Sequence, residues 1–385
     1  MKRILFFNDS LAMGGTEKLL VDLLNHLEKK ECELTLLLPE QSEEDILLRK
    51  LSPSIHVKYL FTGKESYIRR KIEQNLMIFF PVYFVNSKGL KESDYDEIFC
   101  FKETFYARMF SKMKLAKILW IHNILYKRKY EIRSLKERFA VWLNKKHIKI
   151  VQRSYDCFDK VICVSDAAKE AYLSVLHDGK QAPNSVEVLY NAIDLTRVVE
   201  LSKAPIEDVP QSITTFVLIT RLSAEKRIDR LFNVVCRLKN EGYAFEVYLI
   251  GEGTDSADMK NELINKGIED LIIPKGRLDN PFPYVLQSKW SLCVSERESF
   301  SLSLLESMAL KTPVITTDCG GPRDIVANGQ YGILVPNSSE GVYEGMKAVL
   351  DDASLSVKYS ADLDRAVARF DYNGWLSHVE RILEV

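Results

Sequence analysis

Short apolar runs alternate with amphipathic, helix-like stretches along almost the whole chain of 385 residues. In the first half the expected strands are 3–8, 33–38, 97–101, 117–122, 160–164 and 186–189, and the expected helices include 16–29 and 166–176. The second half repeats this order, with strands expected at 213–220, 245–251, 271–276, 290–295 and 313–318 and helices near 225–240, 256–266 and 303–310. Such alternation is typical of parallel sheets buried on both faces. The sequence therefore predicts two doubly wound α/β domains that bind ligand at the carboxyl ends of their strands.

The boundary between the domains is expected near residue 195, because 198–212 mixes prolines with polar residues before a new strand begins. We expect one Rossmann-like domain over 1–195 and a second over 196–369. Residues 370–385 predict an amphipathic helix with three apolar residues on one face, Trp375, Val379 and Ile382. The pattern leaves open whether this helix stays with the second domain or crosses back to the first.

Charge is unevenly distributed, although the net charge of the chain is −1. Residues 1–195 hold 32 Lys and Arg against 26 Asp and Glu, and 102–153 alone holds 15 against 3, which favours an anionic surface or partner. The segment 126–153 interleaves apolar and basic residues, as in an interfacial helix on anionic lipid, and 67–85 offers a second contact. A solvated helix with a core-facing stripe explains 126–153 equally well. No nucleic-acid-binding module accompanies the charge, so no nucleic-acid partner is expected.

The seven cysteines are scattered and form no C-x-x-C pair, which is typical of reduced thiols in a cytoplasmic protein. The N-terminus is interpreted as a first strand and not as a signal peptide, and no apolar run is long enough to cross a bilayer. The nearest carboxylate pair for a metal, Asp94 and Asp96, precedes a strand and therefore lies at the wrong end for a ligand site. We expect no metal ion and no other cofactor.

Glycines and basic residues recur where strands are expected to end. "GGTE" (14–17) opens a helix and suits an anion, or it is a plain turn capped by Thr16. "TRLSAEKRID" (220–229) brings Arg221 and Lys226 around Ser223, as a pair for diphosphate oxygens or as solvated surface charge. "LIGEG" (249–253) and "PKGRL" (274–278) suit a flat pocket for a base, or ordinary turns.

The stretch "ESFSLSLLE" (298–306) holds two carboxylates, with Glu298 in a loop and Glu306 inside the following helix. Ser303 and Glu306 match the S-x-x-E pattern of a capping box, which is a structural interpretation of Glu306. "CGGPRDI" (319–325) adds another glycine turn at a strand end. His122 also follows an expected strand, although a lone histidine is more often structural than catalytic. Several such junctions beside a basic pair indicate one shared anionic ligand.

Together these motifs resemble the retaining glycosyltransferases of family 4, which have the GT-B fold. The similarity rests on "GGTE" (14–17), "VS" (164–165), "YNAID" (190–194), "TRLSAEK" (220–226) and the run from "ESFSLSLLE" to "GILV" (298–335). It implies two Rossmann-like domains facing each other across a cleft. The first would bind the acceptor, and the second would bind a nucleotide sugar, with UDP as the expected nucleotide.

The resemblance also implies a role for each matching residue. Arg221 and Lys226 would neutralise the diphosphate, Glu306 would bind the ribose, and Glu298 would bind the donor sugar. The other expected contacts are the amides of Phe300, Ser301 and Leu302 near sugar and phosphate, Leu278 at the base, Gly15 near the diphosphate, and His122 at the sugar. Glu298, His122, Arg221 and Lys226 would be the catalytic residues. The family pattern E-G-F-G-L has serines here at Ser299 and Ser301, which concerns the fit of the donor sugar.

The function we expect is transfer of a sugar, with retention, to a lipid-linked or cell-surface glycan on the cytoplasmic face of the plasma membrane. The enzyme would be peripheral there, through 126–153. Two alternatives keep the fold and change the chemistry: a nucleotide-sugar epimerase, or a transferase with a soluble acceptor. A third is a non-catalytic partner subunit. The sequence does not identify the sugar, the acceptor, the linkage or the oligomeric state.

Overall fold

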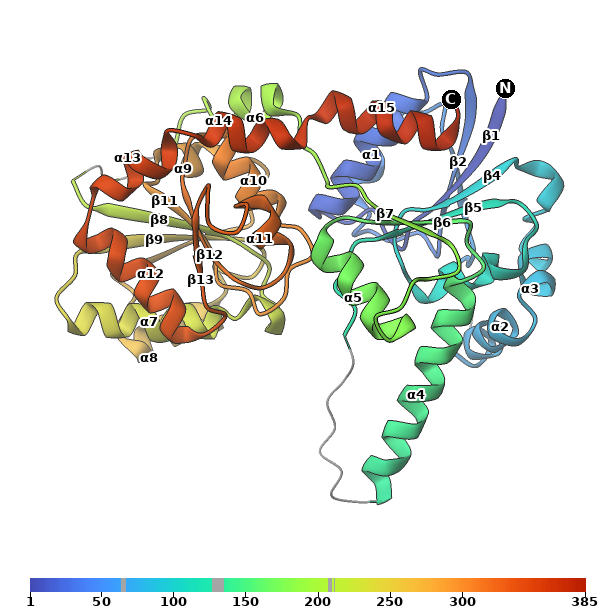
Figure 1. Ribbon diagram of the computed structural model, residues 1–385, viewed down its shortest axis with the longest axis horizontal. Helices are drawn as coiled ribbons and strands as arrows, with labels where there is room; N and C mark the ends of the chain where they lie inside the picture. The colour runs from blue at the N-terminus through green and yellow to red at the C-terminus, as the bar shows by residue number, and fades with distance from the viewer. Residues whose placement is uncertain (64–66, 127–134, 207–209, 211) are drawn as a thin grey trace. The chain divides into compact units, whose positions relative to one another are not determined.

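Each half of the chain forms its own parallel sheet in the computed structural model (Figure 1). The structure describes residues 1–63, 67–126, 135–206, 210 and 212–385. The chain divides into two units: unit 1 comprises Met1–Tyr190 and Asn373–Val385, and unit 2 comprises Asn191–Tyr372. Among the described residues, no helix combines the length and the apolar content that crossing a membrane requires.

The sheet of unit 1 has seven parallel strands in the order β3-β2-β1-β4-β5-β6-β7. Its strands are β1 (Lys2–Phe7), β2 (Cys32–Leu38), β3 (His56–Tyr59), β4 (Glu97–Cys100), β5 (Ala116–Ile121), β6 (Lys160–Cys163) and β7 (Ser185–Val188). Its helices are α1 (Gly15–Leu27), α2 (Tyr67–Phe79), α3 (Pro81–Ser87), α4 (Leu135–Tyr155), α5 (Asp166–His177) and α15 (Tyr372–Leu383), with short 3₁₀ helices η1 (Ile46–Lys50), η2 (Glu92–Asp94) and η3 (Phe105–Lys112).

Unit 2 repeats the same topology with six parallel strands in the order β10-β9-β8-β11-β12-β13. Its strands are β8 (Thr214–Ile219), β9 (Phe245–Ile250), β10 (Ile272–Gly276), β11 (Trp290–Cys293), β12 (Val314–Thr317) and β13 (Ile333–Val335). Its helices are α6 (Leu195–Leu201), α7 (Ile228–Asn240), α8 (Ala257–Lys266), α9 (Phe282–Gln287), α10 (Leu302–Ala309), α11 (Gly321–Ile325), α12 (Ser339–Asp351), α13 (Ser354–Ser360) and α14 (Leu363–Val367), with η4 (Ala224–Lys226) and η5 (Ala368–Phe370).

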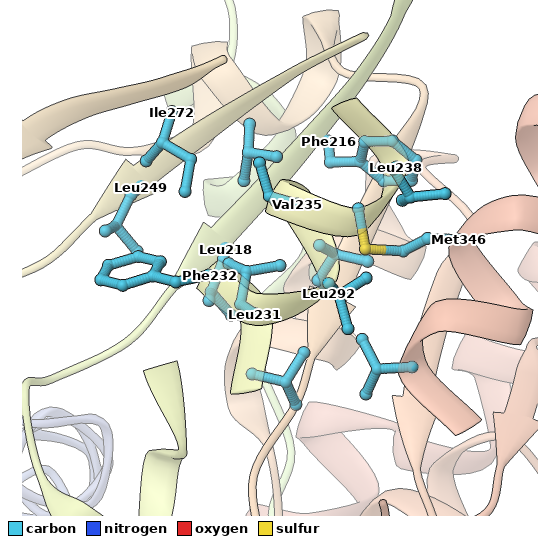
Figure 2. Close-up of a cluster of buried hydrophobic side chains, with 14 of the residues drawn as sticks. Phe216, Leu218, Leu231, Phe232, Val235, Leu238, Leu249, Ile272, Leu292 and Met346 are labelled. Carbon is cyan, nitrogen blue, oxygen red and sulfur yellow. The ribbon is translucent and has the colours of Figure 1, made fainter. Parts of the chain in front are cut away.

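The core of unit 2 fills the space between its sheet and the helices α7 and α12. Figure 2 shows Leu231, Val235 and Leu238 of α7 against the side chains of β8, β9 and β11, with Met346 of α12 beside them. The spacing of the three α7 residues places them on one face of the helix. Their burial therefore fixes how α7 lies on the sheet, and with it the loop that joins β8 to α7.

The prediction of two doubly wound α/β domains is confirmed, since both sheets are wholly parallel and share one strand order. The predicted strands lie within two residues of the observed ones, whereas β3 and β13 were not predicted. The strand order reverses between β1 and β4 in unit 1, and between β8 and β11 in unit 2, because later strands are added toward the opposite edge of the sheet. Ligands of such sheets bind outside the carboxyl ends of the strands at this reversal. The fold therefore directs attention to the loops after these four strands.

The helix near the end of the chain, α15, belongs to unit 1. Its buried Trp375 packs against Trp120 of β5 with ring centroids 5.7 Å apart and the ring planes tilted by 37°. Glu380 accepts a hydrogen bond from His26 at 2.5 Å and pairs with Lys30 at 2.8 Å, which joins α15 to α1. The buried face continues with Leu376, Val379 and Leu383, while Ile382 is half-buried. In the structure these contacts pack α15 on elements of unit 1.

Candidate functional site

In unit 2 an ion pair joins the two loops at the point where the strand order reverses. Lys226, in η4 after β8, pairs its Nζ with Oε2 of Glu298, in the loop after β11. Both side chains are largely buried, at 17% and 15% exposure, and Ser295 donates a second, 3.4 Å hydrogen bond to the same carboxylate oxygen. Burial alone would lower the pKa of Lys226, but the Glu298 charge outweighs it and the pKa is raised. Lys226 is therefore a fixed cation at this edge.

Arg221 lies in the same β8–η4 loop and is exposed to solvent. It lies two residues after the last residue of β8. The hydroxyl of Ser223 donates to Glu225 at 2.8 Å and makes no capping bond to the backbone. The predicted helix begins later than expected, at Ile228, because Arg227 takes a left-handed conformation (φ 50°) between η4 and α7. Arg221 and Lys226 thus sit on an irregular loop and not in the first turn of a long helix.

The backbone at Glu298 is held against the loop that follows β12. Its N–H donates to the carbonyl of Cys319 at 2.9 Å, and its carbonyl accepts from the N–H of Gly321 at 2.8 Å. A Cβ at position 321 would lie 1.9 Å from the carbonyl oxygen of Ser299. Only glycine permits this close approach. The double glycine of "CGGPRDI" therefore serves to position the Glu298 loop.

The predicted capping box of α10 is wrong. The N-cap residue is Ser301 and the helix begins at Leu302, so Ser303 already lies inside the helix and cannot cap it. The Ser303 carbonyl instead accepts a hydrogen bond from Ser307 at 2.7 Å. Glu306 is half-buried in the middle of α10. The capping explanation of Glu306 is thereby removed.

The segment between the two glutamates packs into unit 2. Phe300 is buried with its ring 5.6 Å from that of Phe370, and Ser301 is also buried. The Ser301 and Ser303 hydroxyls lie 3.2 Å apart and are hydrogen-bonded, while Leu302 is half-buried. The additional hydroxyl of Ser301 is therefore engaged within the protein.

On the other side of β8, the loops after β9 and β10 are tied together. The N–H of Gly251 donates to the carbonyl of Gly276 at 2.8 Å, and the N–H of Gly276 donates to the hydroxyl of Thr254 at 3.1 Å. Thr254 is fully buried and in turn donates to the carbonyl of Gly251 at 2.9 Å. Leu278, half-buried, follows two residues after this junction. Sequence reasoning missed Thr254, because a single threonine directly after a glycine is typical of any turn.

In unit 1, Gly15 is the first residue of α1 and is exposed. The N-cap is Gly14, so the alternative of a cap by Thr16 is wrong. Glu17 in the first turn pairs with Lys102 at 3.1 Å, and Lys102 also pairs with Asp9 at 3.1 Å. Burial alone would lower the pKa of Lys102, but these two carboxylates outweigh it and the pKa is raised.

His122 follows β5 and is buried, with its ring 4.8 Å from that of Phe101 and 5.4 Å from that of Trp120. Burial, assisted by the charge of Lys102, lowers its pKa to about 3, so the imidazole is neutral at physiological pH. Beside it lies the buried carboxylate of Glu103, which accepts the backbone N–H of His122 at 2.7 Å. Burial raises the pKa of Glu103 to about 7. Sequence reasoning missed Glu103, although its place just after a predicted strand was a usable signal.

The predicted site residues are divided between the two units. Gly15 and His122 belong to unit 1, each at the carboxyl edge of its sheet. Those of unit 2 are Arg221, Lys226, Leu278, Glu298, Phe300, Ser301, Leu302 and Glu306. Within unit 2 the structure brings Lys226 and Glu298 into direct contact.

Helix α4 carries the described part of the basic segment 126–153, of which 127–134 lie outside the described residues. Exposed apolar and basic side chains occur together on it: Arg138, Trp142, Lys145, Lys146, Lys149, Ile150 and Arg153. The Nζ of Lys146 lies 3.8 Å from the centroid of the Trp142 ring. Helices α2 and α3, with Phe80 between them, expose six more apolar residues, Ile68, Ile72, Phe79, Phe80, Val82 and Tyr83.

The carboxylates Asp94 and Asp96 lie before β4, and Asp96 is bound by Arg3 at 2.8 Å. This fits the interpretation of the segment as a polar loop. Among the described residues, no group of three or more His, Cys, Asp and Glu side chains is arranged to hold a metal ion.

Comparison with known proteins identifies the class. The family model for glycosyl transferases group 1 matches residues 204–366, and that for glycosyltransferase family 4 matches residues 13–197. The chain belongs to the family 4 glycosyltransferases, a retaining family with the GT-B fold, and uses a nucleotide-sugar donor.

Among curated relatives, the chain is 24% identical over 96% of both chains to the N-acetylgalactosamine-N,N'-diacetylbacillosaminyl-diphospho-undecaprenol 4-alpha-N-acetylgalactosaminyltransferase of Campylobacter jejuni. It is 28% identical over 57% of its length to the lipopolysaccharide 1,6-galactosyltransferase of Salmonella typhimurium, of which the match covers 58%. Among solved structures, sucrose-phosphate synthase from Thermosynechococcus elongatus superposes with a TM-score of 0.76 at 16% identity, over 100% of this chain and 98% of the other. Anabaena HepE in complex with UDP and glucose gives 0.74 at 18% identity over the whole of both chains.

Proposed function

We propose that the chain transfers a sugar from a UDP-sugar, with retention, to a lipid-linked or cell-surface glycan at the cytoplasmic face of a membrane. The observation that carries the donor site is the ion pair between Lys226 and Glu298 where the strand order of unit 2 reverses. It holds a cation and a hydroxyl-binding carboxylate together at the edge where such sheets bind nucleotides. Complexes of Anabaena HepE with UDP support the choice of nucleotide.

Each residue then has a role in binding the donor. Arg221 offers a planar fork and Lys226 a point charge to the diphosphate. Glu298 accepts hydrogen bonds from the sugar hydroxyls, and Glu306 accepts them from the ribose. The amides of Phe300, Ser301 and Leu302 approach the sugar and phosphate, and Leu278 borders the base. From unit 1, Gly15 approaches the diphosphate and the neutral imidazole of His122 hydrogen-bonds the donor sugar.

In the transfer step, the bond between the anomeric carbon and the departing phosphate oxygen breaks while the acceptor oxygen bonds to that carbon. The acceptor proton passes to the departing phosphate. Arg221 and Lys226 stabilise the negative charge that develops on the phosphate, which is where fixed cations contribute most to the rate. This route needs no side-chain base.

A thermal-shift panel of nucleoside diphosphates and their sugars tests the donor site, since a bound donor stabilises the fold by mass action. The wild-type chain should be stabilised by UDP and more by one UDP-sugar. Arg221→Ala and Glu306→Ala should each reduce the shift and the rate of transfer, while Arg237→Ala, in the last turn of α7 and paired with Glu340 at 2.8 Å, serves as a control arginine. Undiminished transfer in Arg221→Ala or Glu306→Ala would refute the assignment. Consumption of the donor without an acceptor would favour an epimerase or a hydrolase, and binding without turnover would favour a non-catalytic subunit.

Two observations support the proposed membrane-bound acceptor: the exposed side chains of α4 and the substrate in the name of one relative. The exposed Trp142 and Ile150 lie on a helix whose described exposed charges are basic, as in helices that rest on anionic lipid. Two basic residues of α2 are instead paired with carboxylates, since Arg70 pairs with Glu40 and Arg69 pairs with Glu73. The Campylobacter relative acts, by its name, on a sugar joined through diphosphate to undecaprenol.

Co-sedimentation with vesicles tests this half. Binding should be stronger to vesicles that contain phosphatidylglycerol than to pure phosphatidylcholine, and it should weaken with salt. Replacing Lys145, Lys146 and Lys149 by Glu should abolish the preference for anionic lipid. The same change at Lys260 and Lys266, exposed on α8 of unit 2, provides the control. Transfer that is indifferent to vesicles would favour a soluble acceptor.

A further inference from the structure

One buried carboxylate in unit 1 holds the backbone of the segment that carries His122. Glu103 lies three residues after β4, and its two oxygens accept three hydrogen bonds from residues that follow β5. Oε2 accepts the backbone N–H of His122 at 2.7 Å, and Oε1 accepts the backbone N–H and the side-chain Nδ2–H of Asn123 at 2.9 and 2.5 Å. The carboxylate thus accepts the backbone N–H groups of the two residues that directly follow the end of β5.

The imidazole of His122 is also fixed by its ring neighbours. Phe101 and Trp120 pack on it with centroids 4.8 and 5.4 Å away. The side chain is therefore placed by aromatic packing and the main chain by Glu103. A group that is held from both sides needs little reorganisation when a ligand arrives.

We propose that Glu103 is a positioning residue of the transferase, which fixes the His122–Asn123 backbone so that the imidazole meets the donor sugar in one orientation. The inference rests on the proposed function, which assigns His122 to the donor sugar, and it adds a residue that the family motifs of this sequence do not include. Glu103 itself touches no substrate in this scheme.

The geometry requires a carboxylate at position 103. The N–H groups of His122 and Asn123 donate to different oxygens, so both oxygens must be acceptors. Glutamine offers one acceptor oxygen and one NH₂ group, and that NH₂ would face an N–H donor. A buried donor left without an acceptor is costly, so the segment would shift to another position. Aspartate keeps both acceptors on a shorter stem.

Neighbouring residues connect the same edge to the loop after β1. Lys102, adjacent to Glu103, pairs with Asp9 and with Glu17 at 3.1 Å each. Since β1, β4 and β5 are neighbours in the sheet, Lys102 and Glu103 together tie the β4 loop to those on both sides. The hydrogen bonds that Glu103 accepts are therefore part of a set of contacts that joins the loops after β1, β4 and β5 at this edge of the sheet.

The test compares UDP with the UDP-sugar that stabilises the wild-type chain most, by calorimetry at about pH 8, where the Glu103 carboxylate is charged. Because both charged residues proposed to bind the diphosphate, Arg221 and Lys226, lie in unit 2, Glu103→Gln should leave UDP affinity unchanged. It should weaken binding of the UDP-sugar about tenfold, the equivalent of one lost charge-assisted hydrogen bond. Glu103→Asp should recover part of this loss. Glu97→Gln is the matched control, a buried carboxylate at the other end of β4 that pairs with Lys2 at 2.9 Å.

Hydrogen exchange of the peptide 119–126 gives a readout independent of the donor. The amides of His122 and Asn123 should exchange faster in Glu103→Gln than in the wild type and in Glu97→Gln. Normal exchange, or unchanged discrimination between UDP and UDP-sugar in Glu103→Gln, would overturn the inference. A wild-type chain that binds no UDP-sugar would overturn the proposed function instead. The exchange experiment would still decide whether Glu103 holds the backbone of His122 and Asn123. If Glu103→Gln does not fold, Asn123→Ala is the second variant, because it removes only the side-chain hydrogen bond to Glu103. It should raise the same exchange rates. Unchanged rates in Asn123→Ala would count against the proposed role of Glu103.

Discussion

The ion pair between Lys226 and Glu298 makes an unusual prediction for nucleotide binding: removing the carboxylate should strengthen binding of UDP. In the structure the Nζ of Lys226 is already bound by Glu298. A diphosphate that takes this cation must compete with the carboxylate. The substitution Glu298→Gln removes the charge and keeps the shape, so Lys226 becomes available.

The size of the effect follows from the burial of the pair. Side chains that are 17% and 15% exposed lie between surface pairs and fully buried ones, which places their coupling at about 2 kcal/mol. The raised pKa of Lys226 agrees in direction, because the carboxylate outweighs the effect of burial. A glutamine oxygen retains a hydrogen bond worth about 1 kcal/mol, so about 1 kcal/mol is released, or a fivefold gain in UDP affinity.

Isothermal titration calorimetry at fixed ionic strength measures this gain. Glu296→Gln is the control, because Glu296 is a nearby carboxylate that pairs with Arg227 at 3.3 Å and not with Lys226. It changes the net charge equally and should raise UDP affinity much less. The UDP-sugar should gain less than UDP in Glu298→Gln, since the sugar loses its acceptor. UDP affinity that is equal to or weaker than the wild-type value in Glu298→Gln would refute the reasoning.

Three further predictions concern the scaffold around the site. Gly321→Ala places a Cβ 1.9 Å from the Ser299 carbonyl oxygen and should destabilise unit 2 by about 1–3 kcal/mol and reduce UDP-sugar binding, measured by thermal shift with and without ligand. Trp375→Ala removes the ring that packs against Trp120 and should lower the free energy of unfolding by about 3–5 kcal/mol, measured by urea unfolding followed by tryptophan emission. Burial raises the pKa of Glu103 to about 7, so the part of the stability that comes from proton uptake by its carboxyl group is complete below the unfolded pKa of about 4.3 and is lost as the pH rises through 7, while the hydrogen bonds from His122 and Asn123 persist. Between these pH values the wild type should lose up to about 3 kcal/mol of stability relative to Glu103→Gln, measured by hydrogen exchange of β5. A difference in stability between the two proteins that does not change with pH would contradict the raised pKa of Glu103.

The sequence predicted the central strands well, because strands buried on both faces are continuous apolar runs such as those of β1 and β9. It missed the two short strands β3 and β13. Strand β3, "HVKY", alternates exposed and half-buried residues at the edge of its sheet, so it has no apolar run. Strand β13 is only three residues long. Both form because a neighbouring strand offers free backbone groups, and this information lies outside their own sequence.

The sequence also predicted which loops lie together, because residues at the carboxyl ends of parallel strands share one edge. It could not locate the caps of α1 and α10, since the choice between Ser301 and Ser303 depends on backbone angles that tertiary packing decides. Nor could it pair Lys226 with Glu298, which are 72 residues apart, or reveal that Glu103 faces the amides after β5. Such contacts depend on side-chain directions in the folded unit.

The return of α15 to unit 1 has a consequence for biosynthesis. Unit 1 is assembled from residues 1–190 and 373–385, so unit 2 emerges from the ribosome before unit 1 is complete. Until Trp375 arrives, Trp120 and the neighbouring face of the sheet lack their cover, and the nascent chain exposes apolar surface that invites aggregation. A fragment of residues 191–372 holds all of unit 2, whereas a fragment ending at residue 190 has every strand of its sheet but lacks residues 373–385 of unit 1. Translation therefore imposes an order in which the later unit can mature first.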